Sequence, residues 1–222
     1  MTSRHAAPSA ACSQFVRIAG AIGLAGIVVQ VFALLATPLI RPDVSLLRDG
    51  LSHYAIGPGA GLQETGFVAL AVACAAIGMG LLAIGAESRA AGLLLLLAAI
   101  GFAGLALFPM GQGGPMTPIG DLHLTAGTIG VVLQFAAALA MLARPGSCAA
   151  LGVSRSAGWL LAALAGLAAA GIQLAIWTPG LGLPEGLLAR LAIVPLLAWW
   201  AIVALALLRG NPRPATETSQ GT

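Results

Sequence analysis

Residues 90–108 read AAGLLLLLAAIGFAGLALF and contain no charged or amide side chain. A run of about 20 apolar residues is long enough to cross the hydrocarbon core of a bilayer as one helix. The helix is required there because hydrocarbon offers no water to bond exposed backbone groups. Residues 90–108 are therefore predicted to span a membrane.

Five further apolar runs of similar length occur on either side of this segment. They cover about residues 18–40, 63–85, 122–142, 157–177 and 185–208. Hydrophobic residues make up 59% of the chain and charged residues only 8%, against about 25% charged in an ordinary soluble domain. The chain is therefore predicted to be an all-α, polytopic membrane protein, an antiparallel bundle of six transmembrane helices.

The remaining segments divide the chain into three parts. Residues 1–16 form a polar N-terminal lead, and residues 17–209 form the transmembrane domain. Residues 210–222 form a polar, Pro-containing tail that we expect to be disordered. The first apolar run exceeds the roughly 7–15 residues of a signal peptide's apolar core, so we expect it to be retained as a helix.

All ten basic residues are arginines, and they stand singly between the apolar runs. Because they form no basic face, the net charge of +3 does not indicate nucleic-acid binding. With a cytoplasmic N-terminus, seven arginines would lie on the cytoplasmic side and three on the other. Arginine is enriched on the cytoplasmic side, so we predict that both termini are cytoplasmic and that the protein is a multi-pass protein of the cell (inner or plasma) membrane.

This orientation would gather the polar loops on the outer face. The three loops rich in Gly and Pro are 41–61, 109–121 and 178–184. As contacts for a lipid, a small molecule or a partner, these loops and their edges offer Ser52, Tyr54, Thr117, Asp121, His123, Glu185 and Arg190. The sequence assigns no catalytic residue among them. No acidic side chain and no chain of titratable groups lies at mid-depth in the predicted spans, which argues against a proton-coupled transporter.

A metal centre is one hypothesis for these loops. Its four candidate ligands are His53, His123, Asp49 and Asp121. Imidazole and carboxylate are usual ligands of zinc and similar ions, and an open coordination position would activate water for hydrolysis. The spacing matches no HExxH motif. In the structural alternative, Asp121 caps the helix that follows it and His123 bonds to a loop carbonyl.

Arg190 lies about five residues into the last predicted helix, or about 7–8 Å along its axis. A charge at that depth either snorkels to the headgroups or is paired within the bundle. An ion pair that fastens the outer face is one interpretation, with Glu64, Asp121 or Glu185 as the partner. Contact with an anionic ligand is the alternative.

Small and polar residues inside the predicted helices indicate how these helices pack. Glycines recur at intervals of three, as Gly20, Gly23 and Gly26, as Gly101 and Gly104, and as Gly127 and Gly130. Small residues let two helix backbones approach closely in a membrane. The glutamines at positions 30, 134 and 173 are expected to form hydrogen bonds between helices.

Three stretches of the chain resemble a known family. They are LSHYAIGPGAG (51–61), FPMGQGGPMTPIGDLH (108–123) and GLPEGLLARLAIVPLLAWW (182–200). Through them the chain resembles, over about residues 15–209, the bacterial and archaeal DUF998 family of six-helix membrane proteins. The resemblance implies that topology but no established function. It also implies a set of recurring positions, namely Ser52, Tyr54, Pro109, Pro115, Thr117, His123 and Arg190. One departure is Gly111-Gln112, where the family pattern has Thr-Asp.

The sequence therefore favours a non-enzymatic role. The protein would recognise a lipid, small molecule or partner through a polar cap on the outer face, or act as a membrane scaffold. The first alternative is a metal-dependent membrane hydrolase of lipid-like substrates, with His123 and Asp121 as site residues; the next is a small-solute transporter. The expected surroundings are a lipid bilayer, with no nucleic acid and no cofactor beyond zinc or a similar ion.

Overall fold

The computed structural model describes residues 10–111 and 117–210 of the chain. The α-helices are α1 (Ala10–Ile40), α2 (Ala60–Ile84), α3 (Arg89–Leu107), α4 (Pro118–Leu142), α5 (Pro145–Leu151), α6 (Arg155–Trp177) and α7 (Glu185–Arg209). Three 3₁₀ helices, η1 (Leu51–Ala55), η2 (Ala86–Ser88) and η3 (Pro179–Leu181), lie in the connections. Most of the predicted lead and all but one residue of the predicted tail lie outside the described residues.

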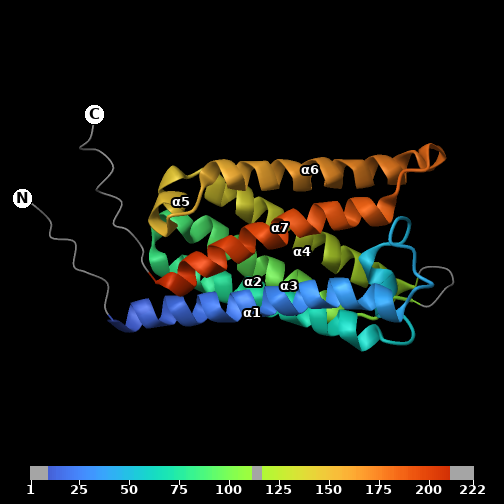
Figure 1. The fold of residues 1–222 in the computed structure, drawn as a ribbon, viewed down its shortest axis with the longest axis horizontal. Helices are drawn as coiled ribbons and strands as arrows, with labels where there is room; N and C mark the ends of the chain where they lie inside the picture. The colour runs from blue at the N-terminus through green and yellow to red at the C-terminus, as the bar shows by residue number, and fades with distance from the viewer. Residues whose placement is uncertain (1–9, 112–116, 211–222) are drawn as a thin grey trace, which may run out of the picture.

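Six of the helices, all except α5, are long and apolar enough to cross a membrane. The described residues contain no strand. The prediction of an all-α bundle with six membrane-spanning helices is therefore confirmed. An even number of spans places the start of the first helix and the end of the last helix at the same end of the bundle. Figure 1 shows the start of α1 and the end of α7 together at the left.

Two helices, α1 and α4, begin four or more residues earlier than the sequence predicted. Helix α1 begins at Ala10 because residues 10–17 contain neither Gly nor Pro and bring Val16 into the core. Helix α4 begins at Pro118, whose fixed φ suits the first helical position. The hydroxyl of Thr117 accepts a hydrogen bond of 3.1 Å from the backbone N–H of Gly120. Thr117 is thus the N-cap, and the prediction that Asp121 caps α4 is wrong, because Asp121 already lies in the first turn.

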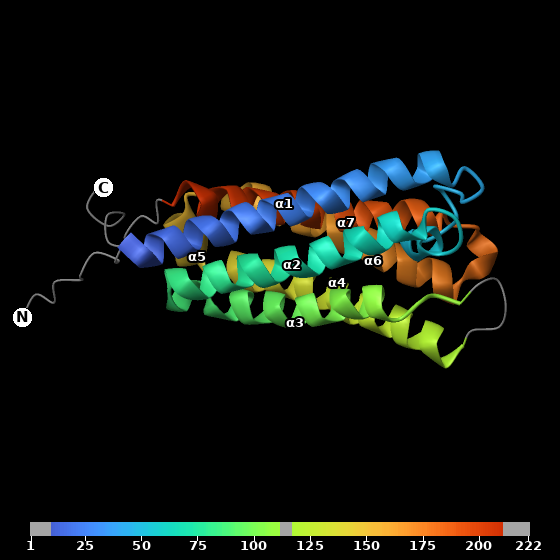
Figure 2. The same ribbon diagram turned by 90° about the horizontal axis from the view of Figure 1, so that it is seen from below.

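The helices form an incomplete ring around a central core. Helix α1 packs against α2 and α7, and α2, α3 and α4 follow as neighbours. Figure 2 shows α1, α2 and α3 side by side. Helix α6 packs on α7, but α4 and α6 contact each other over a short stretch only. The ring is therefore weakest between α4 and α6.

The predicted glycines stand where two helices touch. An ideal Cβ atom at Gly20 in α1 would lie 2.4 Å from the backbone nitrogen of Leu208 in α7. One at Gly101 in α3 would lie 2.7 Å from the Cα atom of Gly130 in α4. Gly23, Gly26, Gly104 and Gly127 each face a neighbouring helix as well. The prediction that these small residues permit close packing is confirmed.

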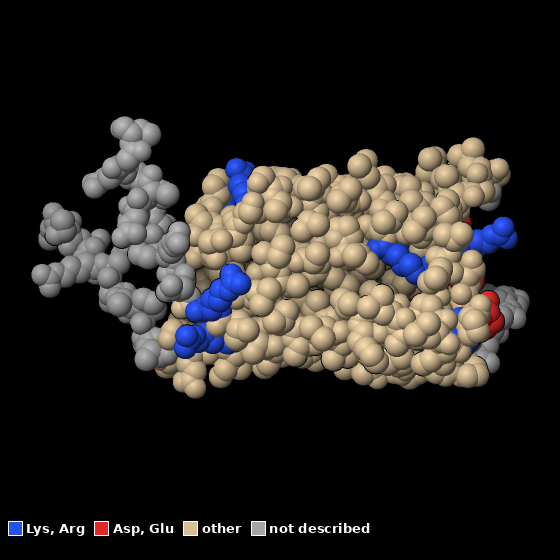
Figure 3. All heavy atoms as spheres, in the orientation of Figure 1, with Lys and Arg blue, Asp and Glu red and all other residues tan. Residues whose placement is uncertain are grey.

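The two ends of the bundle differ in structure. At one end, η2 and α5 form short connections beside the start of α1 and the end of α7 (Figure 1). At the other end, residues 41–59 with η1 fold over the bundle, and we call this segment the cap. On the face seen in Figure 3, charged side chains lie towards the two ends and leave the middle uncharged. This distribution suits a bilayer around the middle of the bundle.

Candidate functional site

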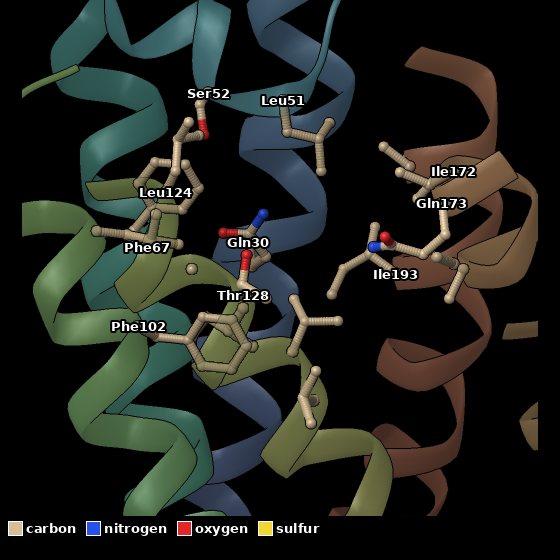
Figure 4. A pocket seen from close by; sticks show the side chains of 18 residues that line it. Gln30, Leu51, Ser52, Phe67, Phe102, Leu124, Thr128, Ile172, Gln173 and Ile193 are labelled. Atoms are coloured by element: carbon tan, nitrogen blue, oxygen red, sulfur yellow. The ribbon is translucent and has the colours of Figure 1, made fainter. Parts of the chain in front are cut away.

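A cavity of about 370 Å³ lies inside the half of the bundle that carries the cap. Leu51 and Ser52 of the cap line one end of it, as Figure 4 shows. Its other walls come from α1, α2, α3, α4, α6 and α7, and most of the lining is apolar. The polar side chains in the wall are those of Gln30, Ser52, Thr128 and Gln173.

The cavity opens sideways between α4 and α6, where the ring of helices is weakest. Thr128 and Val132 of α4 line the cavity and have exposed side chains. Ala169 and Gln173 of α6 do the same on the opposite side of the gap. A molecule could therefore pass between the cavity and the surroundings of the apolar middle of the bundle without crossing the cap.

Gln30 is the deeply buried polar residue of the cavity wall. Its side chain is only 1% exposed, and its Oε1 atom has no hydrogen-bond partner among the described residues. A buried amide oxygen without a partner costs about 1–3 kcal/mol. The sequence predicted a hydrogen bond between helices at this position. That prediction is confirmed for Gln134 of α4, whose Nε2 atom donates to the Sγ atom of Cys74 in α2 at 3.8 Å. The Oε1 atoms of both Gln30 and Gln134 have no hydrogen-bond partner among the described residues.

His123 joins the cap to the loop that precedes α4. Its ring is fully buried, with Nδ1 2.7 Å from the carbonyl oxygen of Phe108 and Nε2 2.9 Å from the Oγ atom of Ser52. A carbonyl can only accept, so Nδ1 carries the proton. In the neutral ring Nε2 is then an acceptor, and the Ser52 hydroxyl donates to it. The expectation that His123 bonds to a loop carbonyl is confirmed.

Arg190 fastens the cap to α7 through backbone carbonyls. Its Nη1 atom donates to the carbonyl oxygens of Leu46 at 2.7 Å and of Asp49 at 3.2 Å. The Nη2 atom donates to the hydroxyl of Tyr54 at 3.3 Å, and the guanidinium lies 5.6 Å from the centre of the Tyr54 ring. Nη1 also donates to Gly186 in its own helix.

The prediction that Arg190 forms an ion pair with a carboxylate is wrong. Within the described residues the ion pair is that of Arg41 with Asp43, at 2.7 Å in the cap. The turn formed by residues 46–49 presents its carbonyl oxygens directly to α7, where a Cβ atom on Gly186 would lie 2.5 Å from the carbonyl oxygen of Asp49. Carbonyl groups at this distance satisfy the guanidinium without a carboxylate.

Arg41 closes the base of the cap. Besides its ion pair with Asp43, it donates from Nη1 to the carbonyl oxygen of Ile56, at the far end of the cap. The hydrogen bond from Arg41 holds the pKa of the Asp43 carboxyl below its usual value. Arg41 and Arg190 therefore tie the cap both to itself and to the bundle.

The other predicted site residues are dispersed over the cap end. Asp121 and Glu185 are exposed. His53 is also exposed, with Nδ1 3.3 Å from the carbonyl oxygen of Gly50. The carboxylate of Asp49 accepts from the backbone nitrogen of Ser45 at 2.6 Å. No group of three or more His, Cys, Asp or Glu residues among those described is arranged to hold a metal ion, so His53, His123, Asp49 and Asp121 form no ligand set in this structure.

Most of the bundle, with the whole cap, matches a known family. The family described as "Protein of unknown function (DUF998)" matches residues 24–206. The chain belongs to the DUF998 family. The matched range includes every residue that lines the cavity of this DUF998 protein, as well as His123 and Arg190. Neither the search of curated proteins nor that of solved structures gives a match.

Proposed function

We propose that this DUF998 protein binds a lipid-like molecule in the cavity beneath the cap. The observation that carries the proposal is the cavity of about 370 Å³, whose mostly apolar wall holds the amide of Gln30. Small-molecule sites are typically concave and mostly apolar, with a few polar groups that orient the ligand. An oxygen atom on the ligand would accept from the Nε2 atom of Gln30, which Figure 4 shows on the cavity side of the amide.

The side opening supports a lipid rather than a water-soluble ligand. Thr128 and Ala169 lie on the two sides of that opening, on helices that are long and apolar enough to span a membrane. A bilayer around these helices would place acyl chains at the opening. An amphipathic molecule would reach the cavity from the bilayer with its apolar chain towards the core and its polar part towards the cap.

Filling the opening should weaken binding. In Ala169→Trp, a large ring enters the cavity wall, whereas in the matched control Ala170→Trp the ring lies on an exposed part of α6 that does not line the cavity. We expect Ala169→Trp to reduce affinity by at least about tenfold, or about 1.4 kcal/mol, and Ala170→Trp to leave it unchanged. The measurement is photo-crosslinking, in vesicles, of an ether-linked monoalkylglycerol that carries a diazirine.

The positions of the crosslinks decide this test. They should map to α4, α6 and α7, and unlabelled monoalkylglycerol should compete for them. Crosslinks spread evenly over the outer surface of the helices, or equal labelling of Ala169→Trp and Ala170→Trp, would show that the cavity binds no such molecule.

We further propose that the cap faces away from the cytoplasm. Arg17, Arg89, Arg144, Arg155 and Arg209 lie near the end opposite the cap, and Arg41, Arg48 and Arg190 lie at the cap end. The larger number of arginines marks the cytoplasmic side. The ligand would then enter from the outer leaflet.

Cysteine labelling tests this orientation. In a chain whose three cysteines are replaced by alanine, His53→Cys lies in the cap and Glu87→Cys lies at the opposite end, and both positions are exposed. A membrane-impermeant maleimide added to spheroplasts should label position 53 and reach position 87 only after permeabilisation. The reverse pattern would mean that the cap is cytoplasmic.

A further inference from the structure

We propose that Ser52 and His123 are the nucleophile and the general base of an acyl-transfer site, which hydrolyses an ester of a single-chain, lipid-like molecule held in the cavity. The inference rests on the proposed binding function, because the ester must occupy the cavity for Ser52 to reach it. An activated serine needs a base within about 2.6–3.2 Å and a third group that orients the base. Ser52, His123 and the carbonyl of Phe108 provide these three parts.

The hydrogen bonds run in the direction that attack requires. The carbonyl of Phe108 holds the proton of His123 on Nδ1, so Nε2 keeps its lone pair for the proton of Ser52. In the other neutral tautomer, Nδ1 and the Phe108 oxygen would be two acceptors facing each other at 2.7 Å. Phe108 therefore plays the orienting part, which belongs to a carboxylate in many serine hydrolases.

Both partners are held in place by their surroundings. The ring of His123 is fully buried, and Phe67 packs edge-on against it with the ring centres 6.1 Å apart. Ser52 lies in η1, two residues from Tyr54, which Arg190 binds. A base and a nucleophile that are already aligned do not have to be ordered during the reaction.

The hydroxyl of Ser52 also faces the space that the substrate would occupy. Ser52 lines the cavity at its cap end, and Figure 4 shows the amide of Gln30 deeper in the same cavity. Gln30 is the side chain that would donate from Nε2 to the oxygen that becomes negative during attack. Ser147 provides the contrast: it is fully buried, its hydroxyl donates to the carbonyl of Glu87 at 2.8 Å, and it lines no described cavity.

The reaction balances with water as the co-substrate. Oγ of Ser52 bonds to the ester carbonyl carbon while its proton passes to Nε2 of His123. The bond from that carbon to the alcohol oxygen breaks, and the alcohol leaves with the proton from His123. Water then attacks the acyl-serine and gives one proton to Nε2. The bond from carbon to Oγ breaks, Ser52 recovers the proton, and a carboxylic acid is released.

A long-chain alkyl fluorophosphonate tests the proposal on the full-length protein in detergent micelles. The hydroxyl of an activated serine displaces fluoride from this reagent and leaves a phosphonate ester that mass spectrometry locates. We expect one adduct per chain, on the peptide that contains Ser52, and none in Ser52→Ala. Ser147→Ala is the matched control and should label at the rate of the unsubstituted protein.

A variant of the base separates chemistry from structure. In His123→Asn the side-chain amide can still donate to the carbonyl of Phe108, but no ring nitrogen reaches Ser52. Loss of a general base lowers rates by about 100-fold or more, so labelling of Ser52 in His123→Asn should slow by at least that factor. The hydrolysis of para-nitrophenyl butyrate should fall in parallel in Ser52→Ala and His123→Asn.

The outcomes distinguish this inference from the binding function. An unlabelled Ser52 in the unsubstituted protein, or equal labelling rates in His123→Asn, would overturn the acyl-transfer proposal. If the ether-linked monoalkylglycerol, which contains no ester, still crosslinks to the cavity, then binding stands and only the chemistry fails. If the crosslinks are also absent from the cavity, the binding function itself has failed.

Discussion

Replacing Arg190 with methionine is expected to lower the thermal unfolding temperature by about 3–12 °C. The substitution removes the donors to the carbonyl oxygens of Leu46 and Asp49 and to the hydroxyl of Tyr54. Loss of hydrogen bonds from a charged group costs about 1.5–3 kcal/mol, and each kcal/mol corresponds to about 2–4 °C in a chain of this size. Because Arg190 fastens the cap, residues 41–59 should also become more open to hydrogen exchange than the helices.

Arg48 provides the matched control for this prediction. It lies in the same turn of the cap and is exposed, so Arg48→Met should change the unfolding temperature little. The unfolding temperature of Arg190→Lys should lie between those of Arg190→Met and Arg48→Met. An ammonium group cannot bind the carbonyls and the tyrosine hydroxyl from two separate nitrogens, as the guanidinium does. Equal unfolding temperatures for Arg190→Met and Arg48→Met would show that Arg190 does not hold the cap. Exchange protection unchanged in residues 41–59 would show the same.

Replacing Gly101 with alanine is expected to separate α3 from α4. The new Cβ atom would lie 2.7 Å from both the Cα and the nitrogen of Gly130, and 2.8 Å from the carbonyl oxygen of Ala126. These are backbone atoms, so the contact is relieved only if the helices move apart. Overpacking of this kind costs about 1–3 kcal/mol, and the loss of helix contacts beside it adds to that cost. We expect the unfolding temperature to fall by about 2–12 °C, as followed by circular dichroism in detergent.

The same substitution at Gly61 provides the control. No heavy atom lies within 4 Å of a Cβ atom built on Gly61 of α2. Alanine has the higher helix propensity, by about 0.8–1.0 kcal/mol, so Gly61→Ala should leave the unfolding temperature unchanged or raise it slightly. If Gly101→Ala behaved like Gly61→Ala, the close approach of α3 and α4 would be without energetic importance.

The residue types in the loops indicated where polar chemistry gathers but not which groups pair. Arg190 illustrates the difference. Its depth in α7 predicted a partner, and carboxylates were the natural candidates, yet the partners are backbone carbonyls of Leu46 and Asp49. Backbone carbonyls are present at every residue, so no sequence pattern distinguishes the ones that a distant arginine will reach. The same reason explains why Phe108 was not recognised as the partner of His123.

Local sequence was more informative for the helix ends, but it did not decide between neighbouring caps. Thr117 and Asp121 are both residue types that cap helices. Thr117 is followed by Pro118, which favours the first helical position and therefore marks the earlier start. That signal was available in the sequence, whereas the additional helix α5 in the α4–α6 link depends on how Ser147 and Cys148 are buried against the bundle.

The sequence by itself determined the membrane class, the six spans and the family. The length and apolarity of a span are local properties of the chain, and they alone decide whether a helix fits the hydrocarbon core of a bilayer. Only the tertiary structure decided that Ser52 and His123, 71 positions apart, meet above a cavity that opens between α4 and α6. Such a meeting depends on the angles and distances at which all the helices pack, and apolar helices of similar composition do not encode these locally.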